Sequence, residues 1–135
     1  MYHLLLCSER RTDVVLVETM LGDAGTRHRV DWAPTVSLAL TTIDISHDAA
    51  IVDVSLEQGR GIELLHAIGS RRPRVPVLAV IAQDDVDLEN VALHAGASAV
   101  VVRNEINARL LDRILRQVIV RQRLAESADA TPDIE

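Results

Sequence analysis

Short apolar runs alternate with longer amphipathic segments along the chain. The apolar runs lie at residues 3–8, 27–33, 49–54, 75–82 and 99–102. The segments between them repeat apolar residues at spacings of three and four, as amphipathic helices do. A strand that is covered on both faces reads as a near-continuous apolar run, whereas a strand with one exposed face alternates. Only residues 27–33 alternate, so the pattern predicts four buried strands and one that is more exposed.

The segments between the apolar runs predict five helices. They lie at about residues 11–22, 34–43, 62–68, 84–95 and 106–124. Thr12 is a suitable N-cap for the first helix, and Gly96 a suitable stop for the fourth. Strict alternation of strands and helices with right-handed crossovers predicts an α/β fold: a three-layer, doubly wound (βα)5 sandwich around a five-stranded parallel sheet.

The length of 135 residues suits one domain. Residues 126–135 are mostly small or polar and include Pro132. We therefore expect a domain at residues 1–125, followed by a flexible tail or a linker to a following domain at 126–135.

The composition excludes several classes of function. Fourteen basic residues face twenty acidic ones, for a formal net charge of −6, which argues against direct binding of nucleic acid by this domain. All the basic residues are arginine, so chemistry that needs a lysine is excluded. No apolar stretch is long enough to span a membrane. The single cysteine, Cys7, excludes an internal disulfide and fits a cytoplasmic location.

The five histidines show no spacing typical of a metal site. They are His3, His28, His47, His66 and His94. None is four residues from another on a helix, so each is predicted to be structural or exposed rather than a metal ligand.

Candidate chemistry lies at the carboxyl ends of the strands, where parallel α/β sheets collect their ligands. Glu9 follows the first strand and Asp53 ends the third, so two carboxylates can converge there. Such oxygen ligands suit Mg²⁺. The alternative is that Asp53 only caps a strand end while Glu9 is solvated. However, a carboxylate at the end of a buried strand is costly unless it is used.

Three ordered segments resemble the receiver domain of two-component response regulators. Residues 53–65 (DVSLEQGRGIELL) are similar to that family's phosphoacceptor strand, loop and helix. Residues 75–85 (VPVLAVIAQDD) resemble its fourth strand and the entry to its fourth helix, and residues 95–103 (AGASAVVVR) the approach to its fifth strand and basic residue. The resemblance covers residues 3 to about 120 and implies a flavodoxin-like sheet.

The resemblance assigns the site residues unevenly. It makes Asp53 the phosphoacceptor, and makes Glu9, Asp53 and the backbone carbonyl of Ser55 the ligands of Mg²⁺. Ser8 stands where the family has a first acidic residue. Arg103 replaces the lysine that pairs with the phosphoryl group.

Further departures affect the residues that read out phosphorylation. Ile81 stands in place of the threonine or serine that ends the fourth strand, and Val100 in place of the aromatic switch residue. Glu57 replaces a proline after the acceptor. We therefore expect a regulatory receiver module with weak Mg²⁺ binding and impaired or atypical phosphorylation, which acts through protein contacts.

The resemblance also implies partners. A sensor histidine kinase or another signalling protein, a fused output domain, and a second copy of the chain are expected. The homodimer would use the family's fourth helix, fifth strand and fifth helix. In the last helix Ile106, Leu110, Leu111, Ile114 and Val118 are predicted to face the core. Leu115, Ile119 and Val120 are predicted to remain uncovered.

Two other functions stay open. The chain can be the N-terminal regulatory segment of a multidomain signalling enzyme, such as a cyclic-di-GMP synthase or hydrolase or a histidine kinase. An independent small enzyme on the same sheet is a weaker alternative, because residues 8–12 (SERRT) lack a glycine-rich phosphate loop.

Overall fold

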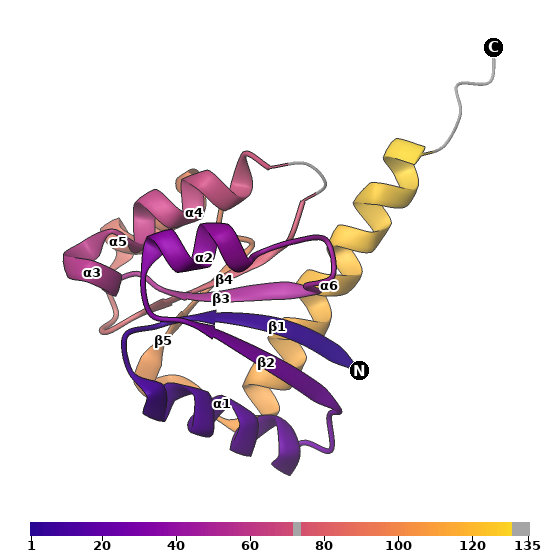
Figure 1. Ribbon diagram of the computed structural model, residues 1–135, viewed down its shortest axis with the longest axis horizontal. Coiled ribbons are helices and arrows are strands. Elements are labelled where there is room, and N and C mark those ends of the chain that lie inside the picture. The colour runs from indigo at the N-terminus through magenta and orange to yellow at the C-terminus, as the bar shows by residue number, and fades with distance from the viewer. Residues whose placement is uncertain (72–73, 131–135) are drawn as a thin grey trace.

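The computed structural model describes residues 1–71 and 74–130 and contains one parallel five-stranded sheet (Figure 1). The strands lie in the order β2-β1-β3-β4-β5. Their bounds are β1 Tyr2–Cys7, β2 His28–Ala33, β3 Ala49–Asp53, β4 Val77–Ile81 and β5 Ala99–Val102. The predicted α/β class, the five strands and the flavodoxin-like arrangement are confirmed.

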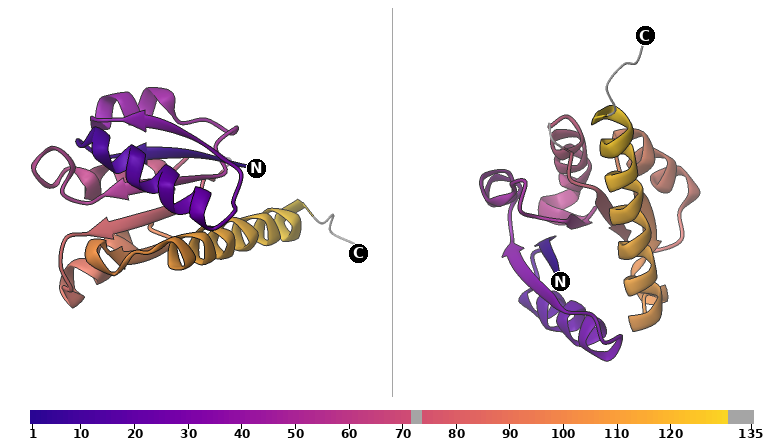
Figure 2. Two further views of the ribbon diagram at one scale, coloured as in Figure 1. Left: turned by 90° about the horizontal axis from the view of Figure 1, so that it is seen from below. Right: turned by 90° about the vertical axis from the view of Figure 1, so that its right-hand side faces the viewer.

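Helices cover both faces of the sheet. They are α1 Arg11–Asp23, α2 Val36–Thr42, α3 Leu56–Gly59, α4 Gly61–Gly69, α5 Val86–Ala95 and α6 Ala108–Ala130. Helices α2, α4 and α5 lie on one face, and α1 and α6 lie on the other (Figures 1 and 2). The one-turn helix α3 and the 3-10 helix η1 (Arg103–Glu105) were not predicted. Both directly follow strands at the carboxyl edge of the sheet.

Each face has its own apolar core. Leu5, Val52 and Ile81 point toward α2, α4 and α5, whereas alternate residues such as Leu4 and Leu78 point toward α1 and α6. This division follows from the period of two in a strand. Burial raises the pKa of the Cys7 thiol to about 12, so this side chain acts as an apolar core residue.

The core stripe of α6 differs from the prediction. Leu115 and Ile119 are buried with 0% and 2% exposure, beside Leu111 and Val118, so the expectation that they remain uncovered was wrong. Apolar residues at spacings of three and four form two adjacent stripes on this helix. The stripe that contains Leu115 packs against the sheet and α1 and is the buried one. Of the three predicted uncovered residues, only Val120 is exposed.

Helix α6 extends well past the sheet. It runs to Ala130, beyond the predicted end near Leu124, and projects at the edge where the N-terminus lies (Figures 1 and 2). The described part of the expected tail, residues 126–130, is therefore helical, and residues 131–135 lie outside the described part of the chain. No helix within residues 1–71 and 74–130 combines the length and apolar character needed to cross a membrane.

The helix ends follow the predicted signals in one of two cases. Gly96 terminates α5 as predicted, with a positive φ of 123°. Thr12, however, lies inside α1: Arg10 is the N-cap residue and makes no side-chain capping bond. Instead Ser8 Oγ accepts a hydrogen bond from the Arg10 backbone N–H at 3.2 Å. Ser8 therefore fixes the entry to α1.

Candidate functional site at the carboxyl edge of the sheet

Four strands deliver side chains to one edge of the sheet. Ser8 follows β1, Asp53 ends β3, Ile81 ends β4 and Arg103 follows β5. Parallel strands place their carboxyl ends together, and Ser8, Asp53 and Arg103 line one pocket there, whereas Ile81 points into the core on the other face of the sheet. The structure thus brings Asp53 and Arg103 together, as expected.

Arg103 links two carboxylates across this site. One terminal nitrogen donates to Asp53 Oδ2 at 2.6 Å, and the other donates to Asp13 Oδ1 at 3.1 Å. The exposed fractions of the side chains are 31% for Arg103, 14% for Asp13 and 15% for Asp53. The planar guanidinium fork therefore neutralises two partly buried acids at once, which a single ammonium group would not do in the same geometry.

The charge of Arg103 is stabilised by these contacts. Burial lowers the pKa of Arg103, but hydrogen bonding and charge attraction from Asp13 and Asp53 outweigh it, and the pKa is raised above its ordinary value. Arg103 therefore remains a cation at every physiological pH.

Asp13 was missed by the sequence analysis. It lies in the first turn of α1, and its Oδ2 accepts a hydrogen bond from Ser8 Oγ. A signal was available: Asp13 precedes Val17 by four residues and Met20 by seven, so it shares their inward-facing stripe. A carboxylate on that stripe needs a partner, and Arg103 is that partner.

The second oxygen of Asp53 is held by its own loop. Ser55 donates to Asp53 Oδ1 from its backbone N–H at 2.9 Å and from its hydroxyl at 2.7 Å. Both oxygens of the predicted phosphoacceptor are therefore engaged, one by Ser55 and the other by Arg103.

Glu9 is turned toward a neighbouring loop. Its Oε1 accepts a hydrogen bond from the Glu57 backbone N–H, while the Glu57 side chain accepts from the Val36 N–H at 2.6 Å. Glu57 and Gln58 have positive φ values of 46° and 61°. A proline cannot adopt such a φ, and it has no N–H for Glu9. Glu57, in the family's proline position, therefore ties this loop to both β1–α1 and α2.

Gly61 allows α4 to start against the end of β3. A Cβ atom at this position would lie 2.5 Å from the carbonyl oxygen of Asp53 and 2.6 Å from the Cα of Val54. Only glycine permits this approach, because both contacts are with backbone atoms. Gly61 thus fixes the distance between α4 and the acceptor strand.

Ile81 and Val100 bring only apolar surface to their positions. Ile81 is 2% exposed and belongs to the core beneath α2, α4 and α5, and Val100 packs partly buried against the same core. Neither carries a hydroxyl or an aromatic ring. Both side chains therefore contribute packing and no hydrogen bond.

The predicted Mg²⁺ ligands Glu9 and Asp53 are both engaged by other groups. Among residues 1–71 and 74–130, the acids of this edge do not form a group of three with ligand atoms within 4.8 Å of one another. Glu9 is bonded to Glu57, and Asp53 is bonded to a guanidinium cation that repels a second cation. Glu9 and Asp53 would therefore have to give up these contacts to bind Mg²⁺ together with the Ser55 carbonyl.

Comparison with known proteins identifies the family to which this chain belongs. The model of the response regulator receiver domain matches residues 4–115. The chain belongs to the response regulator receiver family. A receiver is a regulatory domain rather than a catalytic one.

Individual relatives agree with this family. Two-component response regulator PhoP of Pseudomonas aeruginosa is 32% identical over 97 residues, which cover 68% of this chain and 42% of PhoP. The chain thus spans less than half of that relative.

Solved structures share the fold. A CheY-like receiver domain protein from Methanospirillum hungatei JF-1 has a TM-score of 0.78 at 21% identity, with 93% of this chain and 98% of that chain covered. NtrX from Brucella abortus, solved in complex with ADP, has a TM-score of 0.81 at 21% identity, with 96% of this chain and 29% of that chain covered.

Proposed function

We propose that this receiver has impaired or atypical phosphorylation at Asp53 and signals through protein contacts. The observation that carries the proposal is the guanidinium of Arg103, which spans Asp13 and Asp53 at 3.1 and 2.6 Å. Phosphoryl transfer requires a free carboxylate oxygen and positive charge around the transferred group. Here Asp53 and the cation already satisfy each other, so the resting state is stabilised against the reaction.

Weak Mg²⁺ binding is part of the same proposal. Its ligands would be Glu9, Asp53 and the carbonyl of Ser55. With a serine at position 8 instead of an acid, the site has less negative charge to hold the ion.

Poor readout of phosphorylation is the third part. A hydroxyl at position 81 and an aromatic ring at position 100 would have to respond to a phosphoryl group, and Ile81 and Val100 supply neither. We infer that a change at Asp53 reaches α5 and β5 only weakly.

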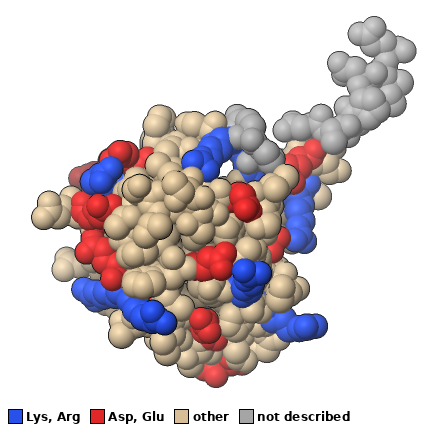
Figure 3. Space-filling model, viewed as in Figure 1, with Lys and Arg blue, Asp and Glu red and all other residues tan. Residues whose placement is uncertain are grey.

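The proposed partners are proteins. A sensor histidine kinase or another signalling protein, and an output domain elsewhere in a longer chain, would contact the receiver. On the face seen in Figure 3, the described acidic and basic side chains are interspersed among uncharged ones. Such a surface suits protein contacts better than the phosphate backbone of a nucleic acid.

A homodimer through α5, β5 and α6 is the proposed quaternary state. Aliphatic side chains are exposed on both helices, among them Val86 at 65% on α5 and Leu124 at 65% on α6. A second copy would bury these residues in a symmetric interface. Sedimentation at increasing protein concentration tests this, with Val120→Arg and Leu124→Arg as a double variant on the surface of α6. A monomer at every concentration would refute the dimer.

The central proposal is tested by amide chemical-shift mapping. The protein is treated with acetyl phosphate or a beryllofluoride analogue, and shifts are followed residue by residue. We expect small changes confined to the loops around Asp53. Large changes that spread through α5 and β5 would refute the proposal.

Two variants sharpen this experiment. Ile81→Thr alone restores the hydroxyl but not the aromatic partner, so we expect no recovery of long-range shifts. Arg103→Lys keeps the charge but gives up the fork that holds both acids, so we expect faster modification of Asp53 than in the wild type. Equal rates of Asp53 modification in the wild type and in Arg103→Lys would show that the Arg103 fork does not slow the reaction.

A further inference from the structure

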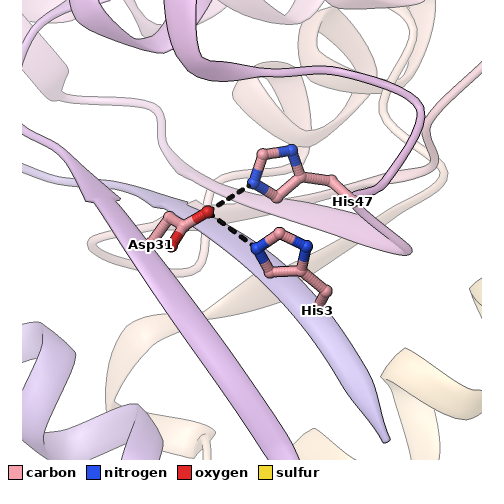
Figure 4. A group of neighbouring side chains, drawn as sticks. All are labelled: His3, Asp31 and His47. Carbon is pink, nitrogen blue, oxygen red and sulfur yellow. Dashed lines mark hydrogen bonds and ion pairs between the residues drawn. The ribbon is translucent and has the colours of Figure 1, made fainter.

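A second cluster of polar side chains lies near the opposite edge of the sheet. His3 Nε2 is 2.7 Å from Asp31 Oδ2, and His47 Nε2 is 2.9 Å from the same oxygen (Figure 4). The two imidazole rings lie side by side, with centroids 4.3 Å apart. Two rings from separate elements thus converge on one carboxylate oxygen.

The fold assembles this cluster from three segments. His3 is in β1, Asp31 is in β2 and His47 precedes β3. In the parallel register His3 pairs with Arg29, so Asp31 is two residues further along β2 on the same face as His3. Separations of 28 and 16 residues along the chain explain why the spacing of the histidines gave no signal.

The three side chains have the donor set of a transition-metal site. Among residues 1–71 and 74–130, they are the one group of at least three His, Cys, Asp or Glu residues whose ligand atoms lie within 4.8 Å of one another. Two imidazoles and a carboxylate suit Zn²⁺ and similar divalent ions. Tetrahedral Zn²⁺ would separate its ligand atoms by about 3.3 Å, since each bond is about 2.0–2.1 Å long. The two separations between Nε2 and Asp31 Oδ2, 2.7 and 2.9 Å, are shorter than that value by about half an ångström, so a small outward shift of the rings would admit the ion.

The surroundings suit His3 as a metal ligand, whereas His47 must exchange a hydrogen bond to become one. A ring that binds metal through Nε2 must carry its proton on Nδ1, where it needs an acceptor. His3 Nδ1 lies 3.2 Å from the Ser46 carbonyl oxygen. His47 Nδ1 lies 3.7 Å from Asp44 Oδ1 and accepts a bond from the Asp44 N–H at 3.2 Å. Protonation of His47 Nδ1 would replace this bond with one to the Asp44 carboxylate.

The three side chains differ in exposure, and the side of the cluster at Asp31 is open to water. The exposed fraction of the side chain is 2% for His47, 16% for His3 and 28% for Asp31. His47 is therefore fixed in the protein, and water can reach Asp31 to supply a fourth ligand. The other oxygen of Asp31 lies 3.7 Å from the Arg29 guanidinium, which would balance the carboxylate in the absence of an ion.

Asp31 is held as a carboxylate in the ion-free protein. Burial raises its pKa, but hydrogen bonds from His47 and His3 and the attraction of their charge lower it further than burial raises it, so the pKa lies below the usual value of 3.8. The negative ligand is thus available across the physiological pH range.

We propose that His3, Asp31 and His47 form a binding site for Zn²⁺ or a similar divalent transition-metal ion, separate from the pocket around Asp53. Each ring would carry its proton on Nδ1, which leaves both Nε2 atoms and Asp31 Oδ2 to coordinate the ion. The ion would join β1, β2 and the segment before β3 at the amino edge of the sheet.

The test is a titration of the chelator-treated 135-residue protein with Zn²⁺, read by calorimetry and by competition with a zinc indicator. We expect one ion per chain with micromolar affinity or better. Asp31→Asn and His3→Gln should each weaken binding at least tenfold. His94→Gln, on the exposed side of α5, is the matched control and should bind like the wild type.

Wild-type measurements keep the test independent of variant folding. Co²⁺ in place of Zn²⁺ should give visible absorption bands, and ¹⁵N spectra should show two imidazole Nε2 signals moving on saturation with Zn²⁺. The absence of one-to-one binding, two unmoved Nε2 signals, or an equal loss in His94→Gln would each overturn the proposal. None of these results bears on the pocket around Asp53, which Glu9→Gln with Mg²⁺ tests separately.

Discussion

The two edges of the sheet both hold a cluster of three ionisable side chains, but the central group is a cation at one edge and a carboxylate at the other. At the carboxyl edge, Arg103 joins Asp13 and Asp53 and is charged at every physiological pH. At the amino edge, Asp31 joins His3 and His47, whose rings can exchange protons or hold an ion. On the function proposed above, the first edge responds weakly where the receiver family is normally responsive. The second can respond where the family resemblance assigns no function.

Helix α4 has a glycine at each end, Gly61 near the carboxyl edge and Gly69 near the amino edge. Substituting them should give the largest difference in stability between the two edges. Gly61→Ala would place a Cβ 2.5 Å from a backbone oxygen at the acceptor end, so we expect a loss of about 2–3 kcal/mol in the free energy of unfolding. Gly69→Ala, at the other end, would meet its nearest atoms at 3.6 Å. We expect it to change stability by less than about 1 kcal/mol. Urea denaturation measures both, and similar losses would show that the close approach at Gly61 is not special.

Zn²⁺ and Mg²⁺ should differ in their effect on stability, because we expect Zn²⁺ to bind at the amino edge and Mg²⁺ to bind only weakly at the carboxyl edge. With free Zn²⁺ at about ten times its dissociation constant, the unfolding free energy should rise by ~1.4 kcal/mol, because the ion binds only the folded state. Mg²⁺ at the same concentration should leave the melting temperature unchanged. Thermal denaturation with and without a chelator provides the measurement. A larger shift with Mg²⁺ than with Zn²⁺ would reverse the comparison.

Removal of the Arg103 guanidinium should have the smallest of these effects on stability. Arg103→Met leaves Asp13 and Asp53 facing each other, and we expect a loss of about 1 kcal/mol, because a side chain 31% exposed to water is strongly screened. The same variant should bind Mg²⁺ more tightly than the wild type, since two unpaired carboxylates attract a cation. Calorimetry with Mg²⁺ checks this point. Unchanged Mg²⁺ affinity would mean that Arg103 does not exclude the ion.

The sequence predicted the fold because the fold depends on patterns with a short period. Continuous apolar runs and helical spacings specify strands and helices locally, and the crossover rule then leaves few topologies. The stripe of α6 shows the limit of this reasoning. Leu110 and Leu115 both fit a helical stripe, and only packing against the sheet decides that Leu115 is buried.

The two sites were predictable to different degrees. Asp53 ends β3 and Arg103 directly follows β5, so strand order brings both to the same edge of the sheet. Asp13 required knowledge of which face of α1 points inward. The cluster of His3, Asp31 and His47 required the register of β1 with β2 and the path of the loop before β3. Contacts of this kind depend on tertiary structure, and no local spacing encodes them.

Helix α6 extends from one edge of the sheet to the other. It begins shortly after Arg103, and near its far end Arg123 lies 3.4 Å from Asp48, whose other oxygen accepts the backbone N–H of His3. A helix of 23 residues is about 35 Å long, so a tilt of about 5° at one end displaces the other by about 3 Å. Such a tilt would therefore move the projecting tip of α6 by about the width of a water molecule.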